Sequence, residues 1–231
     1  MSRLAPARPF IYVLAGVNGA GKSSVGGAHI ENIGLTWFNP DTYARALVAE
    51  QGCSLEQGNA AAWQFGRKRL ETAIAEKKSF AFETTLGANT IPRLLQEASR
   101  THDVLMWFCG LSSPEQHIAR VQARVAKGGH PIPEKKIRER WDSSRLNVIH
   151  LLPHLARLQV YDNSADVQQG QPIPDPVLVL EVTNGRLMAP DPHDAVALAK
   201  TPAWAKQIVQ AAIDLDEIAR QESPQPTKPT V

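Results

Sequence analysis

Eight consecutive residues near the N-terminus have the composition of a phosphate-binding loop. Residues 16–23 read Gly-Val-Asn-Gly-Ala-Gly-Lys-Ser, which is the pattern Gly-x4-Gly-Lys-Ser. Glycines let the backbone wrap around an anion, so that successive N–H groups and the start of the following helix face the phosphates. This spacing predicts a P-loop that binds the phosphate chain of ATP.

Each part of the loop has an expected role. Lys22 is expected to contact the β- and γ-phosphates, and Ser23 to supply its hydroxyl to Mg²⁺. The residues expected to bind ATP are Gly16, Asn18, Gly19, Ala20, Gly21, Lys22, Ser23 and Ser24. The alternative is a glycine-rich turn without a nucleotide. The apolar run before the loop and the helix expected after it disfavour that alternative.

Nucleotide binding alone does not name an activity, because P-loops occur in switch GTPases, motor ATPases and kinases. The chain has no Asn-Lys-x-Asp motif for guanine and no Leu-Ser-Gly-Gly-Gln segment of ABC-type ATPases. These absences favour a kinase. A kinase needs a carboxylate near the γ-phosphate to activate the acceptor hydroxyl.

Asp41 is the candidate for this general base. It lies in the segment Phe38-Asn39-Pro40-Asp41, just past a short strand expected over residues 36–39. That position places it at the ligand-binding edge of the predicted sheet. Aspartate is also a common helix N-cap, and the two roles are compatible.

A second carboxylate, Glu83, ends the apolar run 79–83 and is followed by Thr84 and Thr85. A carboxylate and two hydroxyls at a strand end can bind a polyhydroxyl ligand, so we expect them to contact the acceptor. Alternatively, Glu83 is a Walker B-like carboxylate that holds the water shell of Mg²⁺, or a solvated strand end. Asp162 is the rival Walker B candidate.

A basic cluster occupies residues 120–145, with eight Lys or Arg against three acids. The segment 128–133, Gly-Gly-His-Pro-Ile-Pro, interrupts it and predicts two helices joined by a hinge-capable loop. We interpret residues 113–145 as an Arg-rich helical lid that brings arginines onto the ATP phosphates. A solvated basic face is the alternative.

Alternating apolar runs and helical patterns predict the scaffold that positions these groups. Strands are expected over residues 10–15, 36–39, 79–83, 103–109 and 158–162, with helices between them. Such alternation predicts an α/β fold of the P-loop NTPase type, with a mainly parallel sheet flanked by helices. Ligands then bind at the carboxyl ends of the strands.

The C-terminal part of the chain has a different pattern. A Gly-, Pro- and Gln-rich link over residues 168–176 predicts a boundary after a kinase core of residues 1–167. The pair Asn184-Gly185 between two apolar runs predicts a small β-hairpin. A last helix over 203–222 completes a C-terminal unit, 168–222, packed on the core. The proline-rich tail 223–231 is expected to be disordered.

Composition narrows the class of protein further. The chain has 231 residues, a net charge of +2 and two cysteines without metal-ligand spacing. This charge is too balanced for wholesale nucleic-acid binding, which makes nucleic acid an unlikely partner. No apolar stretch is long enough to span a membrane and no secretory leader is evident, so we expect a cytoplasmic protein.

Taken together and in order, five segments resemble the zeta toxin family of P-loop kinases, over roughly residues 10–165. They are the loop 16–23, Asn39-Pro40-Asp41, Phe82-Glu83-Thr84-Thr85, the run from Arg120 through Arg124 and His130 to Pro133, and Ile137-Arg138-x-Arg140-Trp141. The chain looks especially like compact, stand-alone zeta-like proteins of bacterial genomes, in which a segment like Tyr161-Asp162-Asn163-Ser164 also follows the lid.

The resemblance implies a kinase that phosphorylates the 3′-hydroxyl of the amino sugar in UDP-N-acetylglucosamine. It assigns ATP and Mg²⁺ to Lys22 and Ser23 and the general base to Asp41. The residues that it implies for acceptor binding are Asn39, Asp41, Glu83, and Thr84 or Thr85. The lid arginines that it implies for the phosphates are Arg124 and Arg140, with Arg120 as a further candidate.

Nothing in the spacing itself selects the acceptor. Related P-loop kinases act on other acceptors, so a nucleoside, an NAD-like compound, an antibiotic or a nucleic-acid end is an alternative substrate. A nucleotide-dependent binding module that couples ATP to a protein partner is an alternative from another class. A small helical antitoxin, which blocks the ATP site of plasmid-borne zeta toxins, is a candidate partner.

Overall fold

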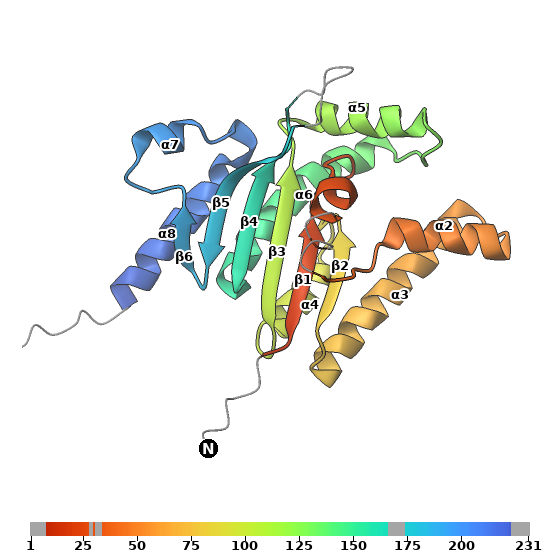
Figure 1. Ribbon diagram of the computed structural model, residues 1–231, viewed down its shortest axis with the longest axis horizontal. Coiled ribbons are helices and arrows are strands. Elements are labelled where there is room, and N and C mark those ends of the chain that lie inside the picture. The colour runs from red at the N-terminus through yellow and green to blue at the C-terminus, as the bar shows by residue number, and fades with distance from the viewer. Residues whose placement is uncertain (1–7, 28–29, 31–33, 166–173, 223–231) are drawn as a thin grey trace, which may run out of the picture.

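The computed structural model of the protein describes residues 8–27, 30, 34–165 and 174–222 (Figure 1). Its centre is a sheet in the strand order β2-β1-β3-β4-β5-β6. The strands are β1 (Phe10–Ala15), β2 (Phe80–Thr84), β3 (Asp103–Gly110), β4 (Arg157–Asp162), β5 (Val177–Thr183) and β6 (Arg186–Ala189). Helices alternate with the first four strands, which confirms the predicted α/β class.

The first four strands run parallel, with β1 between β2 and β3. β1 reads Phe-Ile-Tyr-Val-Leu-Ala and is buried over five of its six residues, as expected for a strand covered on both faces. Parallel strands end at the same edge of a sheet. The P-loop after β1, Thr84 at the end of β2 and Asp162 at the end of β4 therefore lie along one edge.

Helices pack against this sheet and share its apolar core. They are α2 (Pro40–Gln51), α3 (Leu55–Glu76), α4 (Thr90–Ala98), α5 (Pro114–Val125), α6 (Glu134–Leu151), α7 (Ala195–Ala199) and α8 (Lys206–Glu222). In Figure 1, α4, α6 and α8 lie behind the sheet, and α5 lies above the carboxyl ends of the strands. Leu70 of α3, Leu95 of α4, Leu151 of α6 and Ile208 of α8 belong to one apolar core with the strands.

The helix starts follow from local sequence. The predicted capping box is present at α3, where Gln57 N–H donates to Ser54 Oγ at 3.2 Å and Ser54 N–H donates to Gln57 Oε1 at 2.9 Å. α2 starts at Pro40, and Asn39 Oδ1 caps it by accepting from Thr42 N–H at 3.1 Å. Both devices satisfy N–H groups that the first helical turn leaves without partners.

The short strand expected over residues 36–39 is reduced to a single bridge, between Phe38 and Phe82. Phe38 N–H donates to Ala81 O at 2.9 Å, and Phe38 O accepts from Glu83 N–H at 2.9 Å. The pairing stops because Pro40 opens α2 and has no N–H to donate. The bridge nevertheless holds the start of α2 beside Glu83.

The predicted C-terminal hairpin is present and continues the sheet, because β5 pairs antiparallel with β4 and β6 with β5. Asn184 and Gly185 make its turn with φ of 49° and 73°, the positive angles that this turn needs. The last helix starts at Lys206, three residues later than expected, because Ala203–Ala205 form a 3-10 turn. Residues 168–173 and 223–231 lie outside the described residues, so the boundary at 167 and the disordered tail stay predictions.

Trp204 joins the C-terminal segment to the sheet. It is 4% exposed, and its indole N–H donates to Asp162 Oδ1 at 3.0 Å. A Cβ at Gly110 would lie 2.4 Å from the Trp204 ring, so the glycine at the end of β3 makes room for the indole. The anchor therefore combines apolar burial with a satisfied polar group.

We expect Trp204→Ala to lower the free energy of unfolding by about 3–5 kcal/mol, because it removes a buried indole and leaves a cavity. Urea denaturation measures this change as a lower midpoint. Val196 is 67% exposed, so Val196→Ala is the control and should stay within about 0.5 kcal/mol of the wild type. A loss below about 1 kcal/mol for Trp204→Ala would contradict the anchoring role.

Candidate active site

The P-loop turns back over the end of β1. Gly16 and Gly21 have φ of 139° and 94°, and a Cβ at these positions would lie 2.2 Å from Cys109 O and 2.5 Å from Asn163 Nδ2. Both positions therefore require glycine for backbone conformation and for close packing. The helical segment Lys22–Gly26 starts at the last two residues of the loop, so its first N–H groups are available to an anion.

A buried carboxylate, that of Glu83, joins the loop to the sheet edge. Glu83 is 8% exposed; its Oε1 lies 3.6 Å from Lys22 Nζ. Its Oε2 accepts from Ser23 Oγ at 2.8 Å and from Asn39 Nδ2 at 2.9 Å. Lys22 Nζ also donates to Val17 O at 3.2 Å. The structure thus brings together four of the residues predicted for the site.

Asp41 is the second residue of α2 and lines the same cavity as Lys22. The cap of this helix is Asn39, so Asp41 does not have the capping role that the sequence left open. Burial lowers the pKa of Arg140 of α6. The nearby Asp41 carboxylate opposes this shift, because it favours the charged guanidinium. Arg140 Nη1 donates to Asn18 Oδ1 at 2.7 Å.

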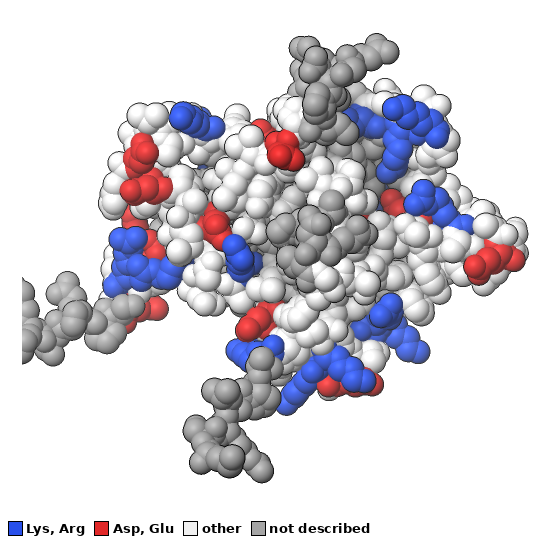
Figure 2. Space-filling view, viewed as in Figure 1, with Lys and Arg blue, Asp and Glu red and all other residues white. Residues whose placement is uncertain are grey.

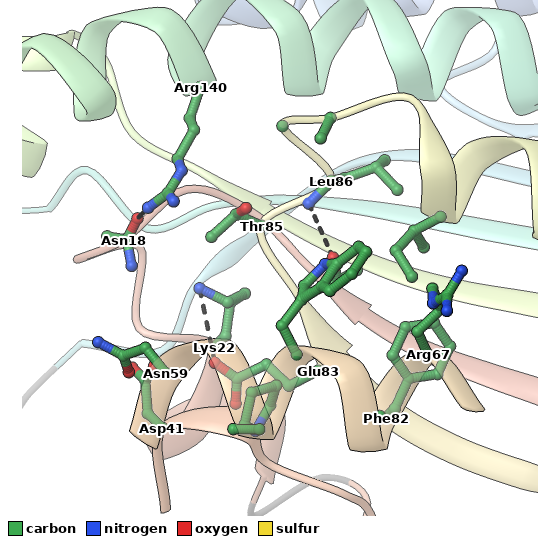
Figure 3. Close-up of a pocket in the computed structure, with 18 of the residues that line it drawn as sticks. Asn18, Lys22, Asp41, Asn59, Arg67, Phe82, Glu83, Thr85, Leu86 and Arg140 are labelled. Carbon is green, nitrogen blue, oxygen red and sulfur yellow. Dashed lines mark hydrogen bonds and ion pairs between the residues drawn. The ribbon is translucent and has the colours of Figure 1, made fainter. Parts of the chain in front are cut away.

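These groups open into a cavity of about 440 Å³ between the P-loop, α3 and the lid helix α6 (Figure 3). Its polar lining includes Asn18, Lys22, Asp41, Asn59, Arg67, Glu83, Thr84, Thr85, Lys136, Glu139 and Arg140. Its apolar lining includes Phe38, Trp63, Phe82, Leu86, Ile91 and Ile132. The Thr84 hydroxyl accepts from Leu86 N–H at 3.1 Å, which leaves Thr85 as the threonine hydroxyl free of that turn.

The other two predicted lid arginines do not line this cavity. Arg120 Nη2 donates to Asn163 O at 2.8 Å and to Ala165 O at 3.2 Å, beside the P-loop. Arg124 Nη2 donates to His130 O at 3.3 Å, within the lid loop. Contact of either arginine with ATP stays a prediction.

The predicted lid is built from α5 and the first part of α6, joined by residues 126–133. Val17 of the P-loop packs with Ile118 and Val121 of α5 and Ile137 of α6 in a small apolar cluster. The two lid helices therefore rest on the P-loop itself. Figure 2 shows Lys and Arg side chains grouped at the upper right, over α5, and scattered charges of both signs on the rest of this face.

Three side chains that the sequence analysis did not assign to the loop hold its carbonyl groups. His117 Nδ1 lies 2.9 Å from Asn18 O. Asn163 Nδ2 and Cys109 Sγ donate to Ala20 O at 2.9 Å and 3.1 Å. These contacts fix the orientation of the loop backbone, in which Ala20 N–H donates to Val17 O at 3.1 Å. No sequence signal marks His117, whereas Asn163 lies in the segment Tyr161-Asp162-Asn163-Ser164.

The proton on His117 can be assigned, because a carbonyl only accepts and Nδ1 must therefore donate. Nε2 is then a buried acceptor that has no partner within the described residues. Burial lowers the pKa of His117 to about 4. The imidazole is thus neutral at pH 7, which keeps an extra positive charge away from Lys22.

The two Walker B candidates differ in their contacts. Asp162 Oδ1 accepts from Trp204 and from the Ser164 hydroxyl, so its carboxylate holds the C-terminal segment. Glu83 contacts Ser23, the expected Mg²⁺ ligand. Mg²⁺ takes one or two protein oxygens in addition to phosphate oxygens and water. The Ser23 hydroxyl and the Glu83 carboxylate fit this need, with no larger cluster of metal-binding side chains in the described part of the chain.

Helices long and apolar enough to cross a membrane are absent from the described residues.

Comparison with known proteins places this geometry in a family. A family model described as an AAA domain matches residues 11–145, more than half of the chain. The chain belongs to this AAA-domain family. The matched span runs from β1 into α6, and it includes the P-loop, Asp41, Glu83 and Arg140.

Solved structures share the fold at low identity. The AvrRxo1-ORF1:AvrRxo1-ORF2 complex determined with ATP has a TM-score of 0.61 and 16% identity, over 95% of this chain and 78% of that chain. A chain of the PezAT chromosomal toxin–antitoxin system of Streptococcus pneumoniae has a TM-score of 0.51 and 15% identity, over 69% of each chain. An uncharacterized Haemophilus influenzae protein is 28% identical over 133 residues, which are 54% of this chain and 88% of that protein.

We expect the stability contributed by neutral His117 to be lost in acid. The ordinary pKa is 6.5 and the folded value is about 4, so the unfolded chain binds more protons between these values. The contribution is complete above about pH 6.5, falls as the pH drops and is gone below about pH 4, a change of about 3 kcal/mol.

His117→Gln removes this titration and keeps a donor for Asn18 O. Its free energy of unfolding, measured with urea from pH 7.5 to 4.5, should fall less than that of the wild type. Parallel profiles for the two proteins would contradict the assignment.

Proposed function

We propose that the protein is an ATP-dependent phosphotransferase whose acceptor hydroxyl binds beside Asp41. The observation that carries the proposal is the shared cavity. Lys22 of the P-loop, the Asp41 carboxylate and Arg140 of the lid line the same space of about 440 Å³, together with apolar walls. Nucleotide hydrolysis needs room for water only, whereas this volume suits an organic acceptor. Likeness to a fold solved with ATP supports the nucleotide.

The residues of the cavity divide the work of phosphoryl transfer. The P-loop N–H groups and Lys22 hold the phosphates of ATP. Ser23, with Glu83 behind it, would hold Mg²⁺, which neutralises charge on the phosphate oxygens when it is bound. Asp41 accepts the proton of the acceptor hydroxyl. The hydroxyl oxygen bonds to the γ-phosphorus of ATP as the bond between that phosphorus and the bridging oxygen of ADP breaks. Arg140 stabilises negative charge in the transition state.

The finer proposal is that the acceptor is the 3′-hydroxyl of UDP-N-acetylglucosamine and that the chain is a zeta toxin-like kinase. The ordered motifs described above support it. Glu83 and Thr85 line the cavity in which the sugar would bind, whereas Asn39, which caps α2 and donates to Glu83, does not line it. The PezAT system is a toxin–antitoxin pair, which supports an antitoxin as a partner of this protein. Nucleosides, NAD-like compounds, antibiotics and nucleic-acid ends are the competing acceptors.

We expect Asp41→Asn to lower acceptor phosphorylation by 10²-fold or more, because it removes the general base. ATP affinity, measured by calorimetry, should change less than twofold, since Asn18, Lys22 and Ser23 are untouched. Phosphate transfer is followed by mass spectrometry across the acceptors named above. Asp214→Asn, at an exposed position on α8, is the matched control and should match the wild type.

Two outcomes would contradict the proposal. Transfer that survives in Asp41→Asn would remove Asp41 as the base. ATP hydrolysis that no acceptor stimulates would favour the nucleotide-dependent binding module over a kinase. Phosphorylation of another acceptor, with UDP-N-acetylglucosamine unchanged, would overturn the finer proposal alone.

The two favoured lid arginines should behave differently. Arg140→Gln is expected to lower kcat about 10²–10³-fold, because Arg140 lines the cavity and stabilises developing charge. Arg124→Gln should lower kcat less than tenfold, since Arg124 is bound to the lid carbonyl of His130. Equal losses for the two variants in steady-state assays would show that the lid rearranges to bring Arg124 onto the phosphates.

A further inference from the structure

A tight turn follows β2 and forms one wall of the cavity. Every residue from 84 to 88 lines the cavity, and in the view of Figure 3 Thr85 lies between Asn18 and Leu86. Leu86 has a φ of 55°, in the left-handed region that leucine rarely adopts. A backbone in this conformation persists only where its surroundings hold it. The position of Thr85 therefore depends on the contacts of the turn.

Part of the turn is held from within. Leu86 N–H donates to Thr84 Oγ1 at 3.1 Å. The Leu86 side chain is 1% exposed and belongs to the apolar core of the sheet. These contacts leave the carbonyl groups of residues 86–88 to be satisfied from outside the turn, because a buried carbonyl without a partner is costly.

Helix α6 supplies the partners of these carbonyl groups. Asn147 Nδ2 donates to Leu86 O at 2.8 Å and to Ala88 O at 3.5 Å, so one amide group spans the turn. Ser143 Oγ donates to Gly87 O at 3.0 Å, with a proton that it shares with a carbonyl of its own helix. Asn147 is 8% exposed, and water therefore competes little for its amide. It is the main anchor of the turn.

The same face of α6 carries Arg140. Arg140, Ser143 and Asn147 are spaced by three and four residues, which puts them on one side of the helix. A Cβ at Gly87 would lie 2.6 Å from Arg140 Cγ, so the turn packs directly on the helix and needs the glycine at this point. Arg140 also donates to Asn18 of the P-loop. One helix face therefore contacts both the P-loop and the turn after β2.

We propose that Asn147 is a positioning residue, which holds the turn after β2 so that the Thr85 hydroxyl meets the acceptor. Ser143 assists it. Asn147 does not line the cavity and acts through Thr85. This role rests on the proposed function, because Thr85 meets the acceptor only if the acceptor binds beside Asp41. The helix that places Arg140 at the phosphates thus also places a group at the acceptor.

Steady-state kinetics of the full chain test this role. The acceptor is the compound that the wild type phosphorylates in the panel above, with UDP-N-acetylglucosamine tried first. Asn147→Ala removes both donors and should raise the acceptor KM at least tenfold, whereas ATP affinity should change less than twofold. Ser143→Ala should raise the acceptor KM about two- to threefold, since Asn147 still holds the turn. Leu146→Ala is the control on the same helix, at a residue that is 51% exposed, and should match the wild type.

A double-mutant cycle separates positioning from a general structural loss. Thr85→Ala alone should raise the acceptor KM at least fivefold. In the Thr85→Ala background, Asn147→Ala should raise it less than twofold further, because the hydroxyl that Asn147 positions is already absent. Hydrogen exchange of a peptide that covers residues 84–89 should be at least fivefold faster in Asn147→Ala than in the wild type, with the P-loop peptide unchanged.

The contradicting results can be told apart. Effects of Asn147→Ala and Thr85→Ala that multiply would make Asn147 an ordinary structural residue and overturn the inference, as would an equal loss of ATP affinity. Unchanged exchange of residues 84–89 would show that Asn147 does not hold the turn. A wild type that phosphorylates no acceptor, with faster exchange in Asn147→Ala, would overturn the proposed function and the acceptor role together, while the hold on the turn stands. If Asn147→Ala does not fold, Ser143→Ala replaces it in the cycle and in the exchange measurement.

Discussion

The site depends on one buried ion pair, between Glu83 at the end of β2 and Lys22 of the P-loop. A carboxylate removed from water is stable only when it is paired and hydrogen-bonded. Glu83 obtains the Lys22 amine at 3.6 Å, the Ser23 hydroxyl at 2.8 Å and the Asn39 amide at 2.9 Å. These partners come from the loop and from the cap of α2. Satisfying Glu83 therefore sets the relative positions of the P-loop, the sheet edge and Asp41.

The P-loop is supported from behind as well as from the sheet. His117 of α5 and Asn163 after β4 hold two of its carbonyl groups. Arg140 of α6 holds the Asn18 side chain. Lid helices that already rest on the loop reduce the rearrangement needed when a nucleotide binds. The geometry for phosphate binding is thus largely present in the fold itself.

Local patterns predicted most of the scaffold, and long-range packing decided the rest. The P-loop, the capping box at Ser54 and the hairpin turn at Asn184 each depend on neighbouring residues, so the sequence predicts them. The sequence could not distinguish Arg124 from Arg140, since both lie on basic lid helices and packing decides which one faces the cavity. His117 contacts a residue 99 positions away. Trp63 could equally have lain on an ordinary helix surface.

The sequence predicts a boundary just before the C-terminal hairpin, but hydrogen bonds join the two sides of this boundary. Trp204 donates to Asp162, and the next residue, Asn163, holds the P-loop through Ala20. Both lie beyond residue 145, where the family match ends. A fusion protein or a truncated chain that keeps these contacts must therefore contain more than the shared family region. It must extend from β1 to α8.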